Sequence, residues 1–279
     1  MTQNIPPPGL DSVPLKTALT IATSDSGGGA GIEADLKTFA AHKVFGLCVL
    51  SAVSAQNTQA VTGLECLSPA LVRAQLQALY DDIPIGAIKI GLLGDAANTL
   101  ETASFLREKL PEVPVVLDPV MVSTSGHIFL ASEAVEALKE LMGQATLITP
   151  NIPEARVLSG LEINSPEERL KAAEKILAGG VKNVLVKGGH GQGPEADDLL
   201  LGPEGPVWLK GPRVRTPNTH GTGCTLSSAI AANLSLGRDL KAAVEEAKTY
   251  VRLGLENSLN LGHGPGPLNH FHQYYRIES

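Results

Sequence analysis

The chain lacks most features of a secreted, membrane-spanning or disulfide-linked protein. Its 279 residues include three cysteines, Cys48, Cys66 and Cys224, which form no CxxC pair and no zinc-type spacing with the seven histidines. An odd cysteine count without a disulfide framework is typical of a reducing compartment. No apolar run approaches the ~20 residues that span a bilayer, and the first residues do not resemble a signal peptide. We therefore expect a cytoplasmic protein without membrane contacts.

Positive charge and the common nucleotide-binding motifs are also scarce. The 22 basic and 29 acidic side chains give a net charge of -7, which argues against nucleic acid as a partner. The sequence has no Gly-Lys dipeptide, so a P-loop is excluded, and the glycine-rich stretch 27–31 does not fit GxGxxG because residue 32 is Ile. A phosphorylated ligand would therefore need local donors.

What the chain does contain is a regular alternation of apolar strands and helices. The expected strands cover residues 18–22 and 46–55, begin again near residues 87, 115, 147 and 184, and end in a hairpin over 198–209. The expected helices cover residues 32–42, 68–80, 98–110, 132–142 and 165–178, with a last one after Asp239. This order predicts a three-layer α/β fold with a mainly parallel sheet. We expect one domain over residues 15–279, after a loose proline-rich tail over 1–14.

Serine and aspartate residues mark the expected helix starts. Ser68 and Asp239 are predicted N-caps, and Ser68 is followed by a proline at the first helical position. Ser165 and Glu168 have the spacing of a capping box.

Polar side chains follow the expected strands, at the edge where parallel sheets bind ligands. The glycine-rich turn over 23–31 and the amide cluster over 56–59 follow the first two strands. Asp118, the segment 149–154 and Lys187 follow later ones. Each of these groups could instead have a purely structural role, since amides and carboxylates also cap turns. Together they favour a ligand site at this edge, with Asp118 suited to Mg²⁺ and Lys187 to a phosphate.

The segment 216–225 joins a flexible turn to the first turn of a buried helix. Gly221 and Gly223 allow close backbone approach to a ligand, and the free N–H groups of a helix start favour an anion. Cys224 lies at the same helix start, where we expect its thiolate to be stabilised. The segment predicts a phosphate-binding site with a thiol at its rim.

These motifs closely resemble the hydroxymethylpyrimidine/phosphomethylpyrimidine kinases of the ribokinase-like superfamily. The resemblance covers about residues 17–271, and its motifs occupy residues 24–32, 56–58, 89–91, 118–121, 149–151 with Glu154, 186–190 and 220–225. It implies ATP-dependent phosphorylation of 4-amino-5-hydroxymethyl-2-methylpyrimidine to the monophosphate and then the diphosphate, in thiamine biosynthesis. It also implies Mg²⁺ and a homodimer.

The same resemblance implies a role for each site residue. The implied sets are an anion hole at Gly221, Thr222 and Gly223, a candidate base at Cys224, a pyrimidine contact at Gln56 with Thr23, Asp25 and Val120 nearby, Mg²⁺ ligands at Asp118 and Glu154, and a nucleotide side at Asn151, Lys187 and Thr216. Thr23 stands where the family usually has glycine, His127 where an acidic residue is common, and the glycines around residues 190–193 indicate a pliable flap.

Two alternatives stay open at this point. Pyridoxal kinase is the nearer one, because relatives with the same Gly-Thr-Gly-Cys segment accept vitamin B6 and both substrates are hydroxymethyl heteroaromatics. Gln56 suits the aminopyrimidine, but dual activity fits the sequence too. A non-catalytic pyrimidine sensor is disfavoured because Lys187, both candidate carboxylates and the anion hole are all present.

Overall fold

The computed structural model describes residues 15–121, 132–189 and 193–275, which form an α/β fold around one nine-stranded sheet. The strands are β1 (Thr17–Asp25), β2 (Phe45–Gln56), β3 (Val61–Cys66), β4 (Ile88–Ile90), β5 (Val115–Leu117), β6 (Leu147–Ile148), β7 (Val184–Val186), β8 (Asp198–Gly202) and β9 (Gly205–Leu209). Their order is β3-β2-β1-β4-β5-β6-β7-β8-β9. The six strands from β2 to β7 in this order are parallel, whereas β3, β8 and β9 are antiparallel to their neighbours. The predicted mainly parallel sheet is confirmed.

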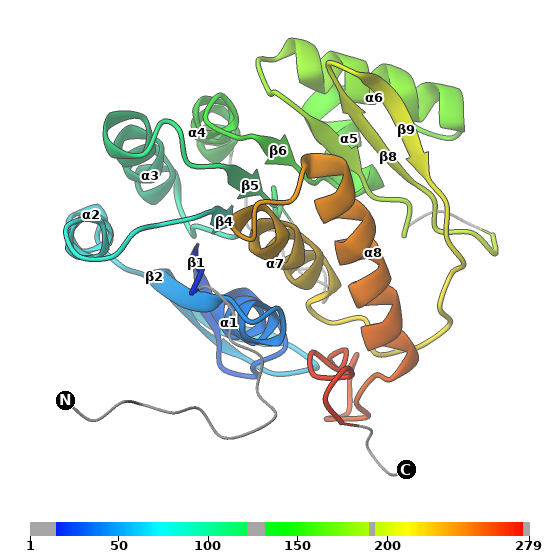
Figure 1. The fold of residues 1–279 in the computed structure, drawn as a ribbon, viewed down its shortest axis with the longest axis horizontal. Helices are drawn as coiled ribbons and strands as arrows, with labels where there is room; N and C mark the ends of the chain where they lie inside the picture. The colour runs from blue at the N-terminus through cyan, green and yellow to red at the C-terminus, as the bar shows by residue number, and fades with distance from the viewer. Residues whose placement is uncertain (1–14, 122–131, 190–192, 276–279) are drawn as a thin grey trace.

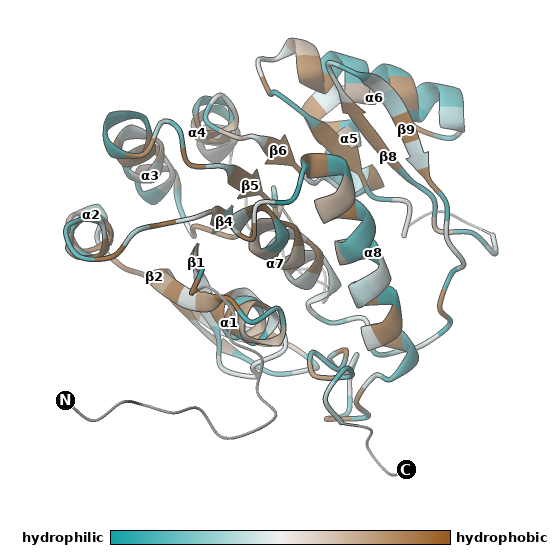
Figure 2. Ribbon diagram, viewed as in Figure 1, coloured by the Kyte–Doolittle hydropathy of each residue, from teal (hydrophilic) through white to brown (hydrophobic). Residues whose placement is uncertain are grey.

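Helices cover both faces of the sheet (Figure 1). They are α1 (Gly31–Ala41), α2 (Pro69–Tyr80), α3 (Ala96–Lys109), α4 (Ser132–Met142), α5 (Ile152–Ser159), α6 (Pro166–Ala178), α7 (Thr222–Ser235) and α8 (Leu240–Glu256). One core packs α2 to α6 against the sheet, and a second core packs α1, α7 and α8 against the other face. Figure 2 shows the central strands in the hydrophobic colours, while α8 alternates between apolar and polar positions. The sheet is therefore buried on both sides, as a parallel sheet requires.

The helix starts follow from local capping chemistry. Ser68 accepts a hydrogen bond from Leu71 N–H, and Asp239 accepts one from Ala242 N–H. Ser165 also caps its helix, but the predicted capping box is wrong. Glu168 accepts the N–H of Asn164 at 2.6 Å instead of that of Ser165, because its side chain reaches one residue further back.

Three elements differ from the expectation. β1 extends to Asp25 because, past a register shift after Ala22, residues 23–25 pair with 52–54 of β2. β3 was not predicted, since it is an edge strand whose half-exposed positions carry little apolar signal. α5 was not predicted either: Pro153 lies in its first turn, where a proline needs no hydrogen-bond partner.

The order of the strands creates a crevice at one edge of the sheet. β1 pairs with β2 on one side and with β4 on the other, so the direction of chain winding reverses at β1. Ligands bind outside the carboxyl ends of strands at such a point. The predicted tail 1–14, His127 and the flap residues 190–192 lie outside the described residues. Within the described ranges no helix is long and apolar enough to cross a membrane.

Candidate active site

One large cavity lies at the carboxyl ends of the parallel strands. Its volume is about 1210 Å³, which exceeds that of a typical small-molecule pocket. The cavity is lined by every residue that the sequence predicted for the site: Thr23, Asp25, Gln56, Asp118, Val120, Asn151, Glu154, Lys187, Thr216, Gly221, Thr222, Gly223 and Cys224. The fold therefore brings together side chains that are up to about 200 positions apart.

The start of α7 has backbone geometry that only glycine fits. Gly221 is the N-cap with φ 75°, and an added Cβ there would lie 1.8 Å from the carbonyl oxygen of Gly29. An added Cβ at Gly223 would meet Asp118 Oδ2 at 3.2 Å and Lys187 Nζ at 3.3 Å. The first-turn N–H groups have no intrahelical acceptor. The N–H of Thr222 donates to the Thr219 carbonyl oxygen at 3.3 Å. The others are suited to an anion, directly beside a lysine and an aspartate.

Lys187 and Asp118 form an ion pair in the cavity wall. Asp118 follows β5 and Lys187 follows β7, and their atoms Oδ1 and Nζ are 2.9 Å apart. Asp118 Oδ1 also accepts a hydrogen bond from Thr149 at 3.2 Å. Burial lowers the pKa of Lys187, but the charges of Asp118 and Glu154 outweigh that effect and raise it above its usual value. Lys187 therefore stays cationic and faces the helix start.

Glu154 and Asn151 have a structural role that the sequence did not reveal. They form a reciprocal capping box at α5: Asn151 Oδ1 accepts Glu154 N–H at 2.9 Å, and Glu154 Oε2 accepts Asn151 N–H at 2.8 Å. Burial raises the pKa of Glu154 to about 7, against the charge of Lys187, which lowers it. Part of the hydrogen-bonding capacity of both side chains is thus used within the protein.

The acidic residues fit a Mg²⁺ ion that takes most of its ligands from water and a phosphorylated ligand. Among the residues that the structure describes, no three His, Cys, Asp or Glu side chains gather into a metal cage. Mg²⁺ is usually bound by one or two carboxylates together with water and substrate phosphates. Asp118 Oδ2 faces the helix start, close to Gly223. The donor set of Asp118 with Glu154 suits Mg²⁺ in the presence of a phosphorylated ligand.

The cavity has a second, cationic end beyond Lys187. It is lined there by Trp208, Lys210, Arg213, Arg215, Lys248 and Arg252. Arg213 is partly occupied, because its guanidinium donates to the carbonyl oxygens of Gly193 and Glu195 at 2.8 and 2.9 Å. Lys248 and Arg252 are paired with Asp198 at 2.6 Å and Glu256 at 2.7 Å, and the Trp208 ring packs under Arg169. The basic side chains and the helix start together fit a nucleotide with its phosphates at α7.

The opposite end of the cavity is organised by Asp25 and His220. Asp25 accepts hydrogen bonds from the N–H groups of Gly27 and Ala30, both at 2.8 Å, and its Oδ2 is 2.8 Å from His220 Nε2. Burial raises the pKa of Asp25, but these bonds, that of His220 first, hold it below its usual value. The carboxylate therefore shapes the turn, which limits its capacity for direct contact with a substrate.

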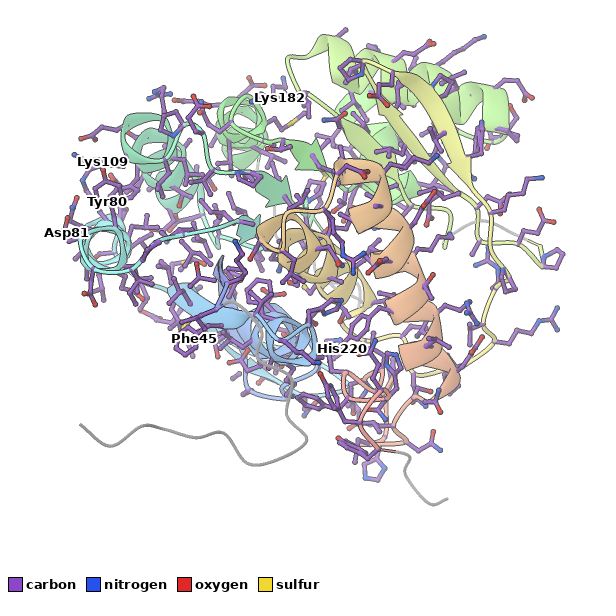
Figure 3. All side chains as sticks on the ribbon, in the orientation of Figure 1. Phe45, Tyr80, Asp81, Lys109, Lys182 and His220 are labelled. Atoms are coloured by element: carbon purple, nitrogen blue, oxygen red, sulfur yellow. The ribbon has the colours of Figure 1, made fainter. Side chains whose placement is uncertain are left out.

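Gln56 places an amide beside that histidine. Its Nε2 lies 3.4 Å from His220 Nε2, and its Oε1 accepts from Ser54 at 3.3 Å. In Figure 3 the label of His220 lies beside α1, the helix that follows the glycine-rich turn of Asp25. An amide and an imidazole on one wall offer both donors and acceptors to the edge of a heterocycle.

Three further predicted residues line the cavity without a free polar group. The Thr23 hydroxyl donates to the Leu92 carbonyl oxygen at 2.9 Å, so the side chain that replaces the usual glycine is held against the wall. Thr216 Oγ1 lies 3.1 Å from the Ser258 hydroxyl. Val120 contributes apolar surface.

Cys224 does not have the lowered pKa that its helix start led us to expect. The side chain is half-buried in the cavity wall. Burial raises the pKa of the thiol to about 11, although Lys89 and the N–H of Gly31 act in the opposite direction. Loss of hydration outweighs the favourable charges, so the thiol form predominates at neutral pH.

The sequence interpretation assigned no role to Lys89, Asp35 and His220. Lys89 and Asp35 form a fully buried ion pair with 2.7 Å between Nζ and Oδ2. A lysine between two isoleucines in a three-residue strand was the available signal, since an unpaired charge is not stable at such a position. His220 belongs to the glycine-rich segment, but its partner Asp25 is 195 residues away.

The chain is similar to a set of known kinases. The family model described as phosphomethylpyrimidine kinase matches residues 25–269. A hydroxymethylpyrimidine/phosphomethylpyrimidine kinase of Rhizobium meliloti is 45% identical over 263 residues, which is 93% of this chain and 98% of the relative. The crystal structure of phosphomethylpyrimidine kinase from Clostridium difficile is 42% identical, with a TM-score of 0.76, and covers 85% of this chain and 98% of that one. An ADP complex of Bacillus subtilis pyridoxal kinase is 36% identical, with a TM-score of 0.85 over 92% and 98% of the two chains. The fold is therefore ribokinase-like.

Proposed function

Because the chain belongs to the phosphomethylpyrimidine kinase family, we propose that it performs two ATP-dependent steps of thiamine biosynthesis. The first phosphorylates the alcohol of 4-amino-5-hydroxymethyl-2-methylpyrimidine, and the second converts that monophosphate to the diphosphate. The observation that carries this proposal is the position of Cys224 in the cavity. It lies at the start of α7, among the first-turn N–H groups and one residue after Gly223, where an added Cβ would contact the Asp118–Lys187 pair.

Each end of the cavity has a separate task in this reaction. Gln56 and His220 hold the ring of the pyrimidine, and the cationic end holds ATP. The N–H groups at the start of α7 bind the transferring phosphoryl group, and Lys187 neutralises the charge that develops on it. Asp118, with Glu154 close by, would hold Mg²⁺, which supplies further charge neutralisation between the phosphates when it is bound. Phosphoryl transfer depends mainly on such alignment and charge stabilisation.

The two steps differ in what they require of Cys224. The first acceptor is an alcohol, whose proton must leave, and a base within reach contributes roughly 10²–10⁴-fold. Because the pKa of the Cys224 thiol is about 11 in the protein without ligands, it is the small thiolate fraction that takes this proton. The second acceptor is an ionised phosphate, which needs no base. Cys224→Ala should therefore lower kcat/KM by about 10²–10⁴-fold in the first step and much less in the second. Separate steady-state assays of each step test this.

Cys48→Ala is the matched control, because Cys48 is also a half-buried free cysteine but does not line the cavity. It should leave both steps unchanged. Equal losses in the two steps for Cys224→Ala would mean that the thiol only positions the acceptor and is not a base.

Pyridoxal kinase activity is a second candidate, favoured by the likeness to the Bacillus subtilis pyridoxal kinase. Production of ADP measured with the pyrimidine alcohol, with pyridoxal and without acceptor distinguishes the two activities. Turnover of pyridoxal alone would replace the main proposal. No turnover of either acceptor would favour a non-catalytic sensor.

We also propose that residues 15–279 act as one kinase domain in a cytoplasmic homodimer. The single sheet that contains all described strands supports one domain. The edge strand β3 and the exposed Val53 on its neighbour β2 offer surface for a second copy. Light scattering coupled to size-exclusion chromatography would measure the oligomeric state, and a monomer at all concentrations would refute the homodimer.

A further inference from the structure

Lys89 is a charged residue at a position where a protein normally places an apolar one. It is the middle residue of β4, with Ile88 and Ile90 on either side, and it is 0% exposed. Replacing a buried ion pair by apolar residues is often neutral or stabilising. Stability alone therefore does not account for a lysine here, and Lys89 also lines the active-site cavity.

Asp35 fixes the position of the Lys89 ammonium group. Its Oδ2 accepts from Lys89 Nζ at 2.7 Å and from the Thr20 hydroxyl at 2.6 Å, while its Oδ1 accepts from the Ser228 hydroxyl at 2.6 Å. These four side chains come from α1, β4, β1 and α7. The carboxylate is fully engaged and 0% exposed, so its part is to hold Lys89 and not to react.

The two helices that flank this pair also place it below Cys224. Gly31 and Asp35 are four residues apart on α1, and Cys224 and Ser228 are four residues apart on α7, so each pair lies on one helix face about 5–6 Å apart. Ser228 donates to Asp35 Oδ1 at 2.6 Å, and Cys224 lies one helical turn before Ser228 on the same face of α7. The contact between α7 and Asp35 is therefore one turn from Cys224, and Gly31, Lys89 and Cys224 line the same cavity.

The Lys89 ammonium group packs against Gly91, the residue that follows β4. An added Cβ at that position would come within 2.7 Å of Lys89 Nζ. An ammonium group carries three donors, and Asp35 takes one of them. Lys89 and Cys224 both line the active-site cavity, so the positive charge is held in the wall that contains the thiol.

Four charged groups act on the thiol from the elements around it. Lys89 on β4 favours the thiolate, whereas Asp35 on α1 and Asp118 after β5 oppose it, and the influence of Lys89 is the largest of the three. Lys187 after β7 also interacts with the thiol. The pKa of Lys89 is itself raised, since Asp35, Cys224 and Asp118 together outweigh the effect of burial, so the lysine stays charged.

We propose that Lys89 is a positioning residue for the alcohol step, whose buried positive charge favours the thiolate of Cys224, and that Asp35 sets how much of this charge the sulfur experiences. This rests on the proposed function of Cys224 as the base. The arrangement has a specific consequence. Removing the cation of Lys89 should make the Cys224 thiol harder to ionise, whereas removing the anion of Asp35 should make it easier to ionise.

The test measures alkylation of Cys224 by iodoacetamide as a function of pH, in protein without nucleotide or metal, with peptide mass spectrometry as the readout. At pH 8.5 we expect Lys89→Met to slow the reaction about tenfold and Asp35→Asn to accelerate it about tenfold, which corresponds to about one pKa unit each. Cys48 in the same sample is the internal control and should react at an unchanged rate.

A double variant guards against loss of folding. Asp35→Asn with Lys89→Met leaves no unpaired charge, and the amide oxygen still accepts from Thr20 or Ser228. Because Lys89 acts more strongly on the thiol than Asp35 does, alkylation in the double variant should be slower than in the parent but faster than in Lys89→Met. Shifts of the same sign in both single variants, or no shift in folded protein, would overturn the proposal.

Kinetics separate this inference from the proposed function. Lys89→Met should lower kcat/KM of the alcohol step more than that of the phosphate step, with a pH profile displaced to higher pH. The two single variants could shift the alkylation rate in opposite directions while Lys89→Met lowers kcat/KM equally in both steps. That result would uphold the effect of Lys89 on the thiol and refute Cys224 as the base.

Discussion

The two lysine–aspartate pairs at the active site are similar in distance and different in their surroundings. Lys89 and Asp35 are 2.7 Å apart with both side chains 0% exposed, whereas Lys187 and Asp118 are 2.9 Å apart with 14% and 2% exposure. The first pair is enclosed by hydrogen bonds from β1 and α7. The second faces a glycine at the start of α7 and opens to the cavity.

Because of these surroundings, the charge of Lys89 is permanently paired, whereas the charge of Lys187 is accessible to a ligand. Every contact of Asp35 is made within the protein, so its pair with Lys89 is present with or without substrate. Lys187 lies at the cavity, where phosphate oxygens can replace Asp118 as its partner. The same two residue types therefore serve as a fixed source of electric field in one place and as an exchangeable ligand contact in the other.

The largest expected effect is on stability, where the enclosed pair should be far more sensitive. Asp35→Ala leaves the ammonium group of Lys89 buried without its partner, which costs about 3–5 kcal/mol. Asp118→Ala should cost only about 1–2 kcal/mol, because Lys187 keeps Glu154 and access to the cavity. Urea unfolding of both variants gives the free energies of unfolding. Equal losses would show that the two pairs are energetically equivalent.

Activity should reverse this order. Lys187→Met removes the charge that we propose contacts the transferring phosphoryl group, and we expect kcat/KM to fall about 10²–10³-fold in both kinase steps with little change in stability. Lys182→Met is the matched control, since Lys182 is an exposed lysine shortly before the same strand (Figure 3). A loss in only one step would place Lys187 with the acceptor instead of ATP.

A smaller effect on stability is expected from His270, a buried base whose ring contacts a hydroxyl group where the two lysines contact carboxylates. His270 is 4% exposed and its Nε2 lies 3.1 Å from the Thr225 hydroxyl. Burial lowers the pKa of His270 to about 3, whereas the unfolded chain has a value near 6.5. The unfolded state then binds the extra proton, so stability is lost as pH falls from about 6.5 toward 3, by at most about 1.4 kcal/mol per pH unit.

The variant His270→Gln should remove this part of the acid dependence. Free energies of unfolding at pH 7 and 4.5 provide the measurement, with the exposed His263→Gln as the control. An unchanged pH dependence in His270→Gln would mean that the histidine is protonated in the folded chain.

The elements that sequence reasoning found are those whose signal is local. Ser68 and Asp239 mark helix starts because a capping side chain acts within three residues. Strand β3 was missed because it is half-exposed, and helix α5 because its first turn, which contains Pro153, lies in the polar segment 149–154 that was assigned to the ligand site.

The site residues also divide into those with a local signal and those whose partners are distant in the sequence. Glycines, Cys224 and Lys187 stand out along the chain, but the partners of Asp25 and Asp35 lie up to 195 residues away. The resistance of the Cys224 thiol to ionisation depends on burial, which no short motif encodes.

The contact between Gly221 and Gly29 joins the two halves of the reaction into one rigid unit. There is no room for even a methyl group between the α-carbon of Gly221 and the Gly29 carbonyl oxygen, and an added Cβ at Gly29 would meet His220 at 2.3 Å. Under the proposed function, a change in the glycine-rich turn beside the acceptor should therefore shift the backbone at the start of α7 that binds the phosphoryl group. Engineering this enzyme for a new acceptor should then succeed more readily at Gln56 or Val120 than in the glycine-rich turn, where specificity and catalytic rate cannot be altered independently.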